Sequence, residues 1–178
     1  MITAPHDFRE RLAFSEAASA EPFWDAVYRK AFPDLVNHMQ TTGATASQRS
    51  GIDRVLHLRN GRTIYIDEKK REQEYPDILL EYVSVDTTGA PGWIEKDLTI
   101  DYLAYAFMPT HRCYLFPWLM LRRAWLHHGN EWKRQYRIVV AQNKGYKTYS
   151  VAIPTKVLRQ AVSVAQIIDV SNELAAHN

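Results

Sequence analysis

The chain has 178 residues, of which 46% are hydrophobic and 24% are charged, with seven glycines and eight prolines. This composition excludes collagen-like and Pro/Gly-rich disordered chains, and it is sufficient for one globular domain over residues 1–178 that folds without a disulfide or metal. The single cysteine, Cys113, excludes an internal disulfide framework and a multi-cysteine zinc site, and it fits a reducing compartment.

The net charge of +2 conceals a strong segregation of charge along the chain. Residues 72–108 hold one basic and eight acidic residues, whereas residues 49–71 hold seven basic and three acidic residues, and residues 109–150 hold eight basic and one acidic residue. Such blocks are typical of an acidic centre beside a basic surface, which suits a polyanion bound around a metal ion. Interleaving in the fold would instead cancel the blocks, and charge alone leaves both interpretations open.

Apolar periodicity predicts the elements in chain order. Residues 7–40 are predicted to be helical, with Pro33 ending or kinking the helix. Residues 51–59 and 62–66 are predicted to form a hairpin around Asn60-Gly61, a favoured two-residue turn. Further strands are predicted at 78–84, 101–107, 112–116 and 146–153, and helices at 117–128, 130–142 and 155–164, with a stop at Gly129. This order predicts an α/β (α+β) fold with a mixed central β-sheet flanked by helices.

The predicted hairpin brings Asp53 close to the run Asp67-Glu68-Lys69-Lys70 at the end of its second strand. Clustered carboxylates raise one another's pKa unless a cation is bound, and their oxygens suit Mg²⁺ or Mn²⁺. Such an ion can bind a scissile phosphate and activate water, while a neighbouring lysine orients that water or stabilises the developing negative charge. The hairpin is therefore the candidate site for chemistry.

An acid early in a hairpin, followed on the next strand by acid-x-lysine, resembles the hallmark of the PD-(D/E)XK nuclease superfamily. The segments GIDR, IDEKKR and DILLEY are also similar to a group of phage and prophage nuclease-like proteins. The resemblance covers roughly residues 20–116. It implies a restriction-endonuclease-like core and an Mg²⁺-dependent nuclease, with an endonuclease acting on DNA expected. The resemblance also implies that the protein is located in the cytoplasm of a bacterium or of a phage-infected host cell.

The same resemblance implies the roles of individual residues. Asp53, Asp67 and Glu68 are the expected metal ligands, and together with Lys69 they form the expected catalytic set. A strict two-residue turn would instead set Asp53 opposite Glu68 and on the face of Lys70, whereas one bulge exchanges the faces and favours Asp67 with Lys69. We prefer the second frame on the resemblance, and geometry leaves both open.

The segment 109–150 combines its positive charge with many aromatic residues. Cations along its two predicted helices suit the phosphate backbone of a nucleic acid, and the candidates are Arg122, Arg123, Lys133, Arg134 and Arg137. Trp118, Leu121 and Trp125 have core spacing and are expected to be buried, as is Cys113. Trp93 and Lys96 follow the third strand and are candidates for the mouth of the site, and Glu21 is a candidate helical acid.

Two other functions remain open at this stage. The chain can be a degenerate, non-catalytic module of the same fold that holds nucleic acid or protein, or a phage-encoded interaction protein. A homodimer is also left open. The N-terminal sequence MITAPHDFRERL carries charges where a signal peptide needs an apolar run, and the longest apolar run, 113–121, is too short to span a bilayer. A cytoplasmic protein with no membrane partner is expected.

Overall fold

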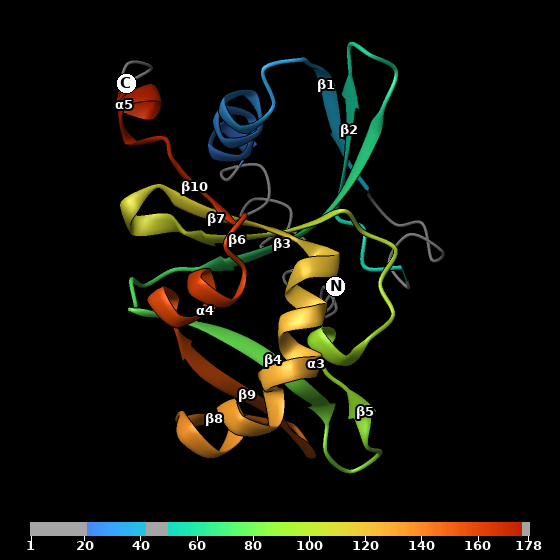
Figure 1. Cartoon of the computed structure of the whole chain (residues 1–178), viewed down its shortest axis with the longest axis vertical. Coiled ribbons are helices and arrows are strands. Elements are labelled where there is room, and N and C mark those ends of the chain that lie inside the picture. The colour runs from blue at the N-terminus through green and yellow to red at the C-terminus, as the bar shows by residue number, and fades with distance from the viewer. Residues whose placement is uncertain (1–20, 42–49, 176–178) are drawn as a thin grey trace, which may run out of the picture.

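The computed structural model describes residues 21–41 and 50–175 (Figure 1). Its strands are β1 (Leu35–Gln40), β2 (Arg54–Leu58), β3 (Thr63–Arg71), β4 (Asp77–Val85), β5 (Ala90–Pro91), β6 (Tyr102–Phe107), β7 (Arg112–Pro117), β8 (Ile138–Asn143), β9 (Tyr146–Pro154) and β10 (Gln166–Asp169). Residues 21–31 are helical, and the later helical elements are η1 (Trp93–Glu95), η2 (Met108–Thr110), α3 (Trp118–Gln135), α4 (Thr155–Ala161) and α5 (Ser171–Ala175).

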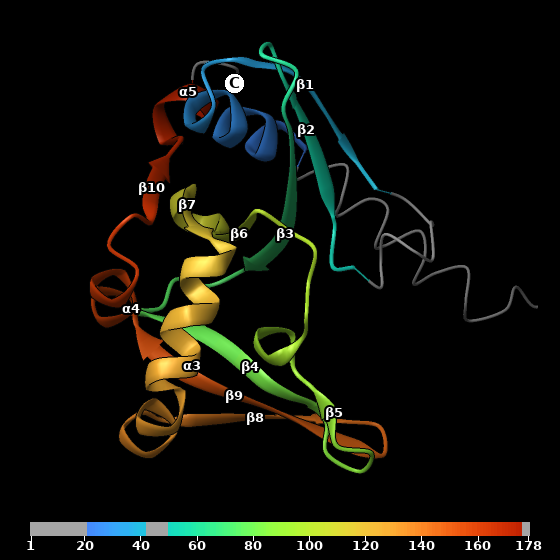
Figure 2. The same cartoon turned by 45° about the vertical axis from the view of Figure 1, so that its right-hand side comes forward.

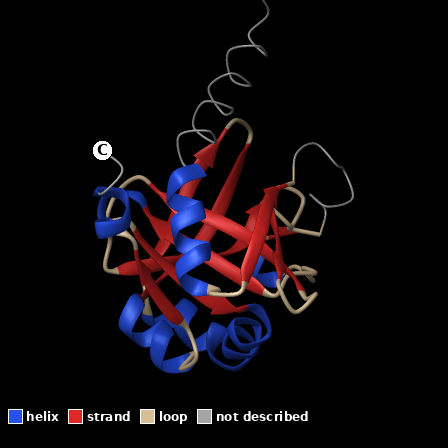
Figure 3. Ribbon diagram, turned by 90° about the horizontal axis from the view of Figure 1, so that it is seen from above, coloured by secondary structure: helices blue, strands red, loops and turns tan. Residues whose placement is uncertain are grey.

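The strands form two sheets rather than the single central sheet expected from the sequence. A mixed six-stranded sheet has the order β1-β2-β3-β6-β7-β10, in which β3 and β6 are parallel and the other neighbours antiparallel. A second, antiparallel sheet has the order β5-β4-β9-β8. The chain between β3 and β6 passes through β4, β5 and η1 of this second region (Figure 2). The fold is therefore mixed α+β, with helices flanking the strands (Figure 3).

Two hydrophobic cores lie on opposite faces of the six-stranded sheet. Because side chains alternate along a strand, β6 sends Leu103, Tyr105 and Phe107 into the first core and Ala104 and Ala106 into the second. The first core is shared with α3, η1 and the second sheet, and the second core is shared with the 21–31 helix, β1 and β2. Each fully buried large aliphatic side chain in them contributes about 1.5–3 kcal/mol to stability.

The hairpin β2–β3 is confirmed, but its turn differs from the prediction. Leu58 N donates to Arg62 O over 2.9 Å, so three residues rather than two connect the strands. The third is Gly61, whose φ of +82° is the left-handed conformation that a three-residue hairpin requires. Arg54 consequently pairs with Ile66 and His57 with Thr63, one residue out of the register that a two-residue turn would impose.

The N-terminal prediction is partly wrong. The helix covers residues 21–31 and ends before Pro33, as the proline predicted, but Leu35–Gln40 is β1 and not a continuation of the helix. β1 pairs with β2 and buries Leu35 in the second core, and this tertiary pairing overrides the helical spacing. Residues 7–20 of the predicted helix lie outside the described residues.

The C-terminal region contains one long helix where two were predicted. α3 continues through Gly129 to Gln135, and the segment predicted to complete a second helix to residue 142 is instead β8, paired with β9. A Cβ at Gly129 would lie 3.0 Å from the Trp125 ring, so the packing of this ring favours glycine at that position of α3. The strands predicted at 78–84, 101–107, 112–116 and 146–153 are confirmed within one or two residues, and β10 was not predicted.

None of the helices in the described part of the chain has the length and apolar character needed to cross a membrane.

Candidate functional site

A cavity of about 390 Å³ lies beside the adjoining ends of β2 and β3. The hairpin contributes its acidic and basic side chains, and the segment from η1 toward β6 contributes the opposite wall. The lining residues are Gly51, Asp53, Asp67, Lys69, Trp93, Lys96 and Leu98. The cavity thus gathers residues that are far apart in the sequence, from Gly51 to Leu98.

Asp53 and Asp67 face each other because of the hairpin register. Arg54 pairs with Ile66, so the next position outward sets Asp53 against Asp67 on the same face of the sheet. Asp53 is fixed there by two backbone bonds: its own N donates to Ile66 O over 2.9 Å, and Glu68 N donates to its Oδ2 over 2.8 Å. The backbone therefore holds this carboxylate in place.

Asp67 is the most deeply buried charged group of the site, with 2% of its surface exposed. The pKa of Asp67 is raised to about 7, chiefly by burial; the charge of Lys69 opposes the rise, and the Asp53 carboxylate adds to it. Lys69 Nζ donates a short hydrogen bond to Asp67 Oδ1. Two carboxylates and one ammonium group thus share a small, partly desolvated space.

The register also decides between the two overlapping acid-lysine frames. Asp67 and Lys69 line the cavity, as the resemblance favoured, whereas Glu68 and Lys70 do not. Glu68 points to the opposite face of β3, because side chains alternate along a strand. Lys70 Nζ lies 3.6 Å from the Glu72 carboxylate. The structure therefore brings Asp53, Asp67 and Lys69 together, and it separates the expected ligand Glu68 from them.

Glu68 belongs to a buried polar network with Arg54, which the sequence did not single out. Arg54 is 1% exposed, and its Nε donates to Glu68 Oε1 over 2.5 Å. Its Nη1 and Nη2 donate to Glu21 over 2.6 and 3.0 Å, and Tyr28 Oη donates to Glu68 Oε1 over 2.7 Å. Burial raises the pKa of Glu68, and the Arg54 charge opposes the rise. Glu21, the candidate helical acid, is therefore a partner of Arg54 and does not line the cavity.

The predicted nucleic-acid-binding residues do not form one row. Lys133 and Arg134 are in the last turns of α3, but Arg137 lies beyond the helix and approaches Asp77 at 3.5 Å. Lys133 lies over the Tyr82 and Trp125 rings, and Arg122 donates to the backbone oxygen of Ile94. Arg123 and Arg134 are exposed. Three of the five cations therefore have protein partners.

The donor set of the cavity suits a hard divalent cation. The described residues contain no group of three or more His, Cys, Asp or Glu side chains arranged for a metal. Mg²⁺, however, is commonly held by one or two carboxylates together with waters and substrate phosphates. Burial is the main cause of the raised pKa of Asp67, the Lys69 charge offsets it only in part, and the adjacent Asp53 carboxylate adds to it, so a further cation would stabilise the ionised pair. Asp53 and Asp67 therefore fit such an ion.

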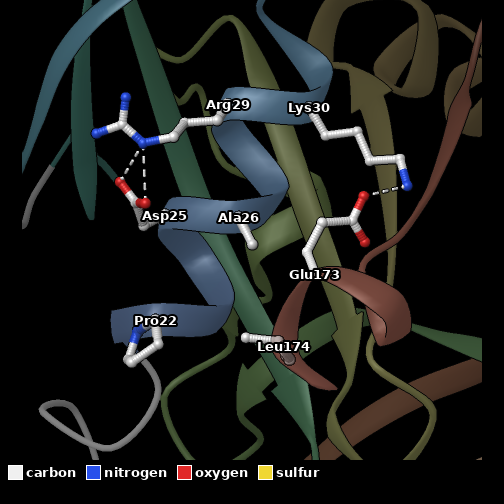
Figure 4. A pocket seen from close by; sticks show the side chains of 7 residues that line it. All are labelled: Pro22, Asp25, Ala26, Arg29, Lys30, Glu173 and Leu174. Carbon is white, nitrogen blue, oxygen red and sulfur yellow. Dashed lines mark hydrogen bonds and ion pairs between the residues drawn. The ribbon is translucent and has the colours of Figure 1, made fainter. Parts of the chain in front are cut away.

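A second, larger cavity of about 720 Å³ lies between the 21–31 helix and α5 (Figure 4). Its charged side chains pair with one another, Asp25 with Arg29 and Lys30 with Glu173. The remaining lining is apolar, from Pro22, Ala26 and Leu174. Each carboxylate of this cavity thus has its own cationic partner.

Comparisons with protein-family models, with curated proteins and with solved structures found no match to this chain.

Proposed function

We propose that the protein is a metal-dependent nuclease of the PD-(D/E)XK type that hydrolyses DNA phosphodiester bonds. The observation that supports this most is the placement of Asp53, Asp67 and Lys69 on one face of the β2–β3 hairpin, lining one cavity. The proposal includes a restriction-endonuclease-like core. It draws support from the 21–31 helix packed on an antiparallel hairpin whose second strand is parallel to β6.

Asp53 and Asp67 are the residues that would hold Mg²⁺ or Mn²⁺. Bound there, the ion supplies Lewis-acid stabilisation of the phosphate and lowers the pKa of a bound water. Asp53 is oriented by the Glu68 amide, and Asp67 is shielded from solvent, so both carboxylates are held in position before a ligand arrives. This preorganisation reduces the cost of assembling the site.

Lys69 supplies a cation at the edge of the site. Its side chain is 32% exposed and hydrogen-bonds the buried Asp67, so its ammonium group lies at the boundary between the carboxylates and solvent. From there it orients an attacking water or stabilises charge that develops on phosphorus. Glu68, engaged by Arg54 and Tyr28, acts on the opposite face as a positioning residue for the hairpin end.

The experiment compares cleavage of plasmid and single-stranded DNA in Mg²⁺, Mn²⁺ and EDTA. Wild type is expected to cut with Mg²⁺ or Mn²⁺ and not with EDTA. Asp53→Asn, Asp67→Asn and Lys69→Ala should each lose about 100-fold or more in rate, because the first two weaken the site for the metal ion and the third removes the cation that acts on the water or the phosphate. Lys70→Ala is the matched control and keeps the wild-type rate. Cutting that survives both Asp substitutions excludes this site.

One observation favours a second candidate, the non-catalytic module that binds nucleic acid or protein. The ammonium of Lys69 already satisfies the buried Asp67, so the pair is a stable arrangement without substrate. DNA binding by wild type without cleavage under any of the cation conditions would support this alternative over the nuclease.

A further inference from the structure

The wall of the cavity opposite the hairpin is fixed to the second sheet. Gly92 precedes η1, and its N donates to Tyr82 O of β4 over 3.0 Å. The backbones approach so closely that a Cβ on Gly92 would lie 2.2 Å from Glu81 O. The start of η1 is therefore held directly against β4.

The same turn is also fixed to α3 by three side chains. Arg122 donates to the backbone oxygen of Ile94, and Trp125 Nε1 donates to Glu95 Oε1 over 2.9 Å. The rings of Trp93 and Trp118 pack with centroids 6.5 Å apart. η1 is thus fastened on two sides, and the backbone that carries Lys96 has a defined position relative to the cavity.

Lys96 is a cation without a partner in the part of the chain that the structure describes. It caps η1, lines the cavity and is exposed, and its ammonium group has neither a hydrogen bond nor an ion pair there. Its neighbours Glu95 and Asp97 do not line the cavity. Lys69, in contrast, is engaged by Asp67. A rigid turn therefore presents one available positive charge across the cavity from the carboxylate pair.

The charge balance of the cavity indicates which ligand this lysine suits. Two carboxylates and two lysines sum to zero when all four are ionised, so the cavity by itself has little attraction for an anion. A divalent cation at Asp53 and Asp67 would give the cavity a charge of about +2, which favours a phosphate group. Lys96 then faces that phosphate with all three of its donors available.

We propose that Lys96 is the phosphate-contacting residue for a nucleic-acid strand bound in this cavity, in place of a basic track along α3. This inference rests on the proposed function, because it takes the strand to be the ligand of the same site. Arg122 and Lys133, two of the α3 cations, contact Ile94 and the Tyr82 and Trp125 rings instead.

The test measures binding of a short fluorescein-labelled single-stranded DNA by anisotropy over a range of salt, in Ca²⁺ and in EDTA. Lys96→Gln should weaken binding in Ca²⁺ and lower the log–log salt slope by about 0.7, the value of one released phosphate contact on a single strand. Lys156→Gln, an exposed lysine on α4 that does not line the cavity, is the matched control and should keep the wild-type slope. The Lys96 effect should shrink in EDTA.

The outcomes separate this inference from the proposed function. Wild-type affinity and slope in Lys96→Gln, with a loss in Arg123→Gln/Arg134→Gln, overturn the inference and place the contact on α3. Cleavage by wild type with unchanged KM in Lys96→Gln overturns the inference alone and leaves the nuclease proposal standing. A wild-type chain that neither binds nor cuts DNA overturns both. Because the Lys96 side chain is exposed, its substitution is expected to leave the melting temperature unchanged.

Discussion

Asp67 combines two properties that rarely coexist in one acid: it is almost fully buried, and it lies beside another carboxylate. Burial and the Asp53 charge both favour its neutral form, and Lys69 compensates for them only in part. Ionisation of Asp67 therefore costs free energy in the folded state, and a bound cation would remove this cost. This cost should be visible in stability as well as in activity.

The pH dependence of stability tests this property. The folded pKa of Asp67, about 7, lies above its ordinary value, so the folded state binds a proton more tightly than the unfolded state. The resulting stabilisation is complete below about pH 4 and is lost as pH rises through about 7, at most about 4 kcal/mol. Urea unfolding in EDTA should show this decline in full in wild type and in the exposed-acid control Asp34→Asn, and a smaller decline in Asp67→Asn, where only other groups such as Glu68, whose pKa burial also raises, contribute. An unchanged decline in Asp67→Asn contradicts the assignment.

Arg54 gives a second prediction at the scale of one residue. Arg54→Ala leaves Glu68 buried without its main cation and should reduce the free energy of unfolding by about 3–5 kcal/mol. The control is Arg29→Ala, which removes the exposed pair with Asp25 and should cost less than about 1 kcal/mol. Chemical denaturation measures both. An equal decrease in the free energy of unfolding in the two variants would mean that the Arg54 network does not stabilise the fold more than an exposed ion pair does.

At the scale of elements, local signals predicted the hairpin and most strands. Asn60-Gly61 between two alternating apolar segments needs no distant partner to form a turn, so β2 and β3 were found. The exact register was not, because it depends on whether Arg59 joins the strand or the loop. The frame of Asp67 and Lys69 was preferred on the resemblance alone, and the faces of β3 were assigned only once Ile64 and Ile66 were placed in the second core.

Elements that depend on distant contacts were predicted poorly. Gly129 is an ordinary helix-stop signal, yet α3 continues through it to Gln135, and the segment after it forms β8 by pairing with β9. The same holds for the site: the partners of Glu68 are 14 and 40 positions away, and nothing near residue 68 in the sequence indicates that it turns from the cavity. Trp93 and Lys96 were candidates for the mouth of the site, but what holds them there, Gly92 and α3, was visible only in three dimensions.

Gly92 provides the prediction for the η1 element. Gly92→Ala places a Cβ against the backbone of Glu81, which cannot yield as a flexible side chain can, and should destabilise the fold by about 1–3 kcal/mol or more. Gly61→Ala, with open space around its Cβ and only a positive φ to strain it, should cost about 1–2 kcal/mol. Urea unfolding compares them. A smaller loss at Gly92 than at Gly61 contradicts the close fit of η1 on β4.

On the scale of the whole molecule, the two cores are joined by shared strands. β6 and β7 contribute alternate residues to both, so neither core can lose its packing without disturbing the sheet between them. Four of the five tryptophans, including Trp93 and Trp125, lie in the first core, whereas Trp24 and the fully buried Cys113 lie in the second. The molecule therefore carries a natural probe on each side of the six-stranded sheet.

These probes should report a single transition. We expect tryptophan fluorescence and pulse labelling of the Cys113 thiol to give the same midpoint in urea, because unfolding of one core exposes the other. Trp24 also lies in the second core, so the fluorescence is measured in a Trp24→Phe variant, whose remaining tryptophans lie in the first core. Labelling of Cys113 at urea concentrations where this fluorescence is still native would show that the second core opens independently. Cys113→Ser, which has no thiol, serves as the control for labelling that does not involve Cys113.

The sheet order also has a consequence for the order of folding. Asp53 and Asp67 meet through a hairpin whose ends are 14 residues apart, so they can come together from local contacts. The wall that carries Lys96 depends on pairs far apart in sequence, such as β4 with β9, and on α3. We therefore expect the carboxylate pair to form early on the folding pathway and the opposite wall late. The nascent chain would present two neighbouring acids to cations well before the cavity around them is closed.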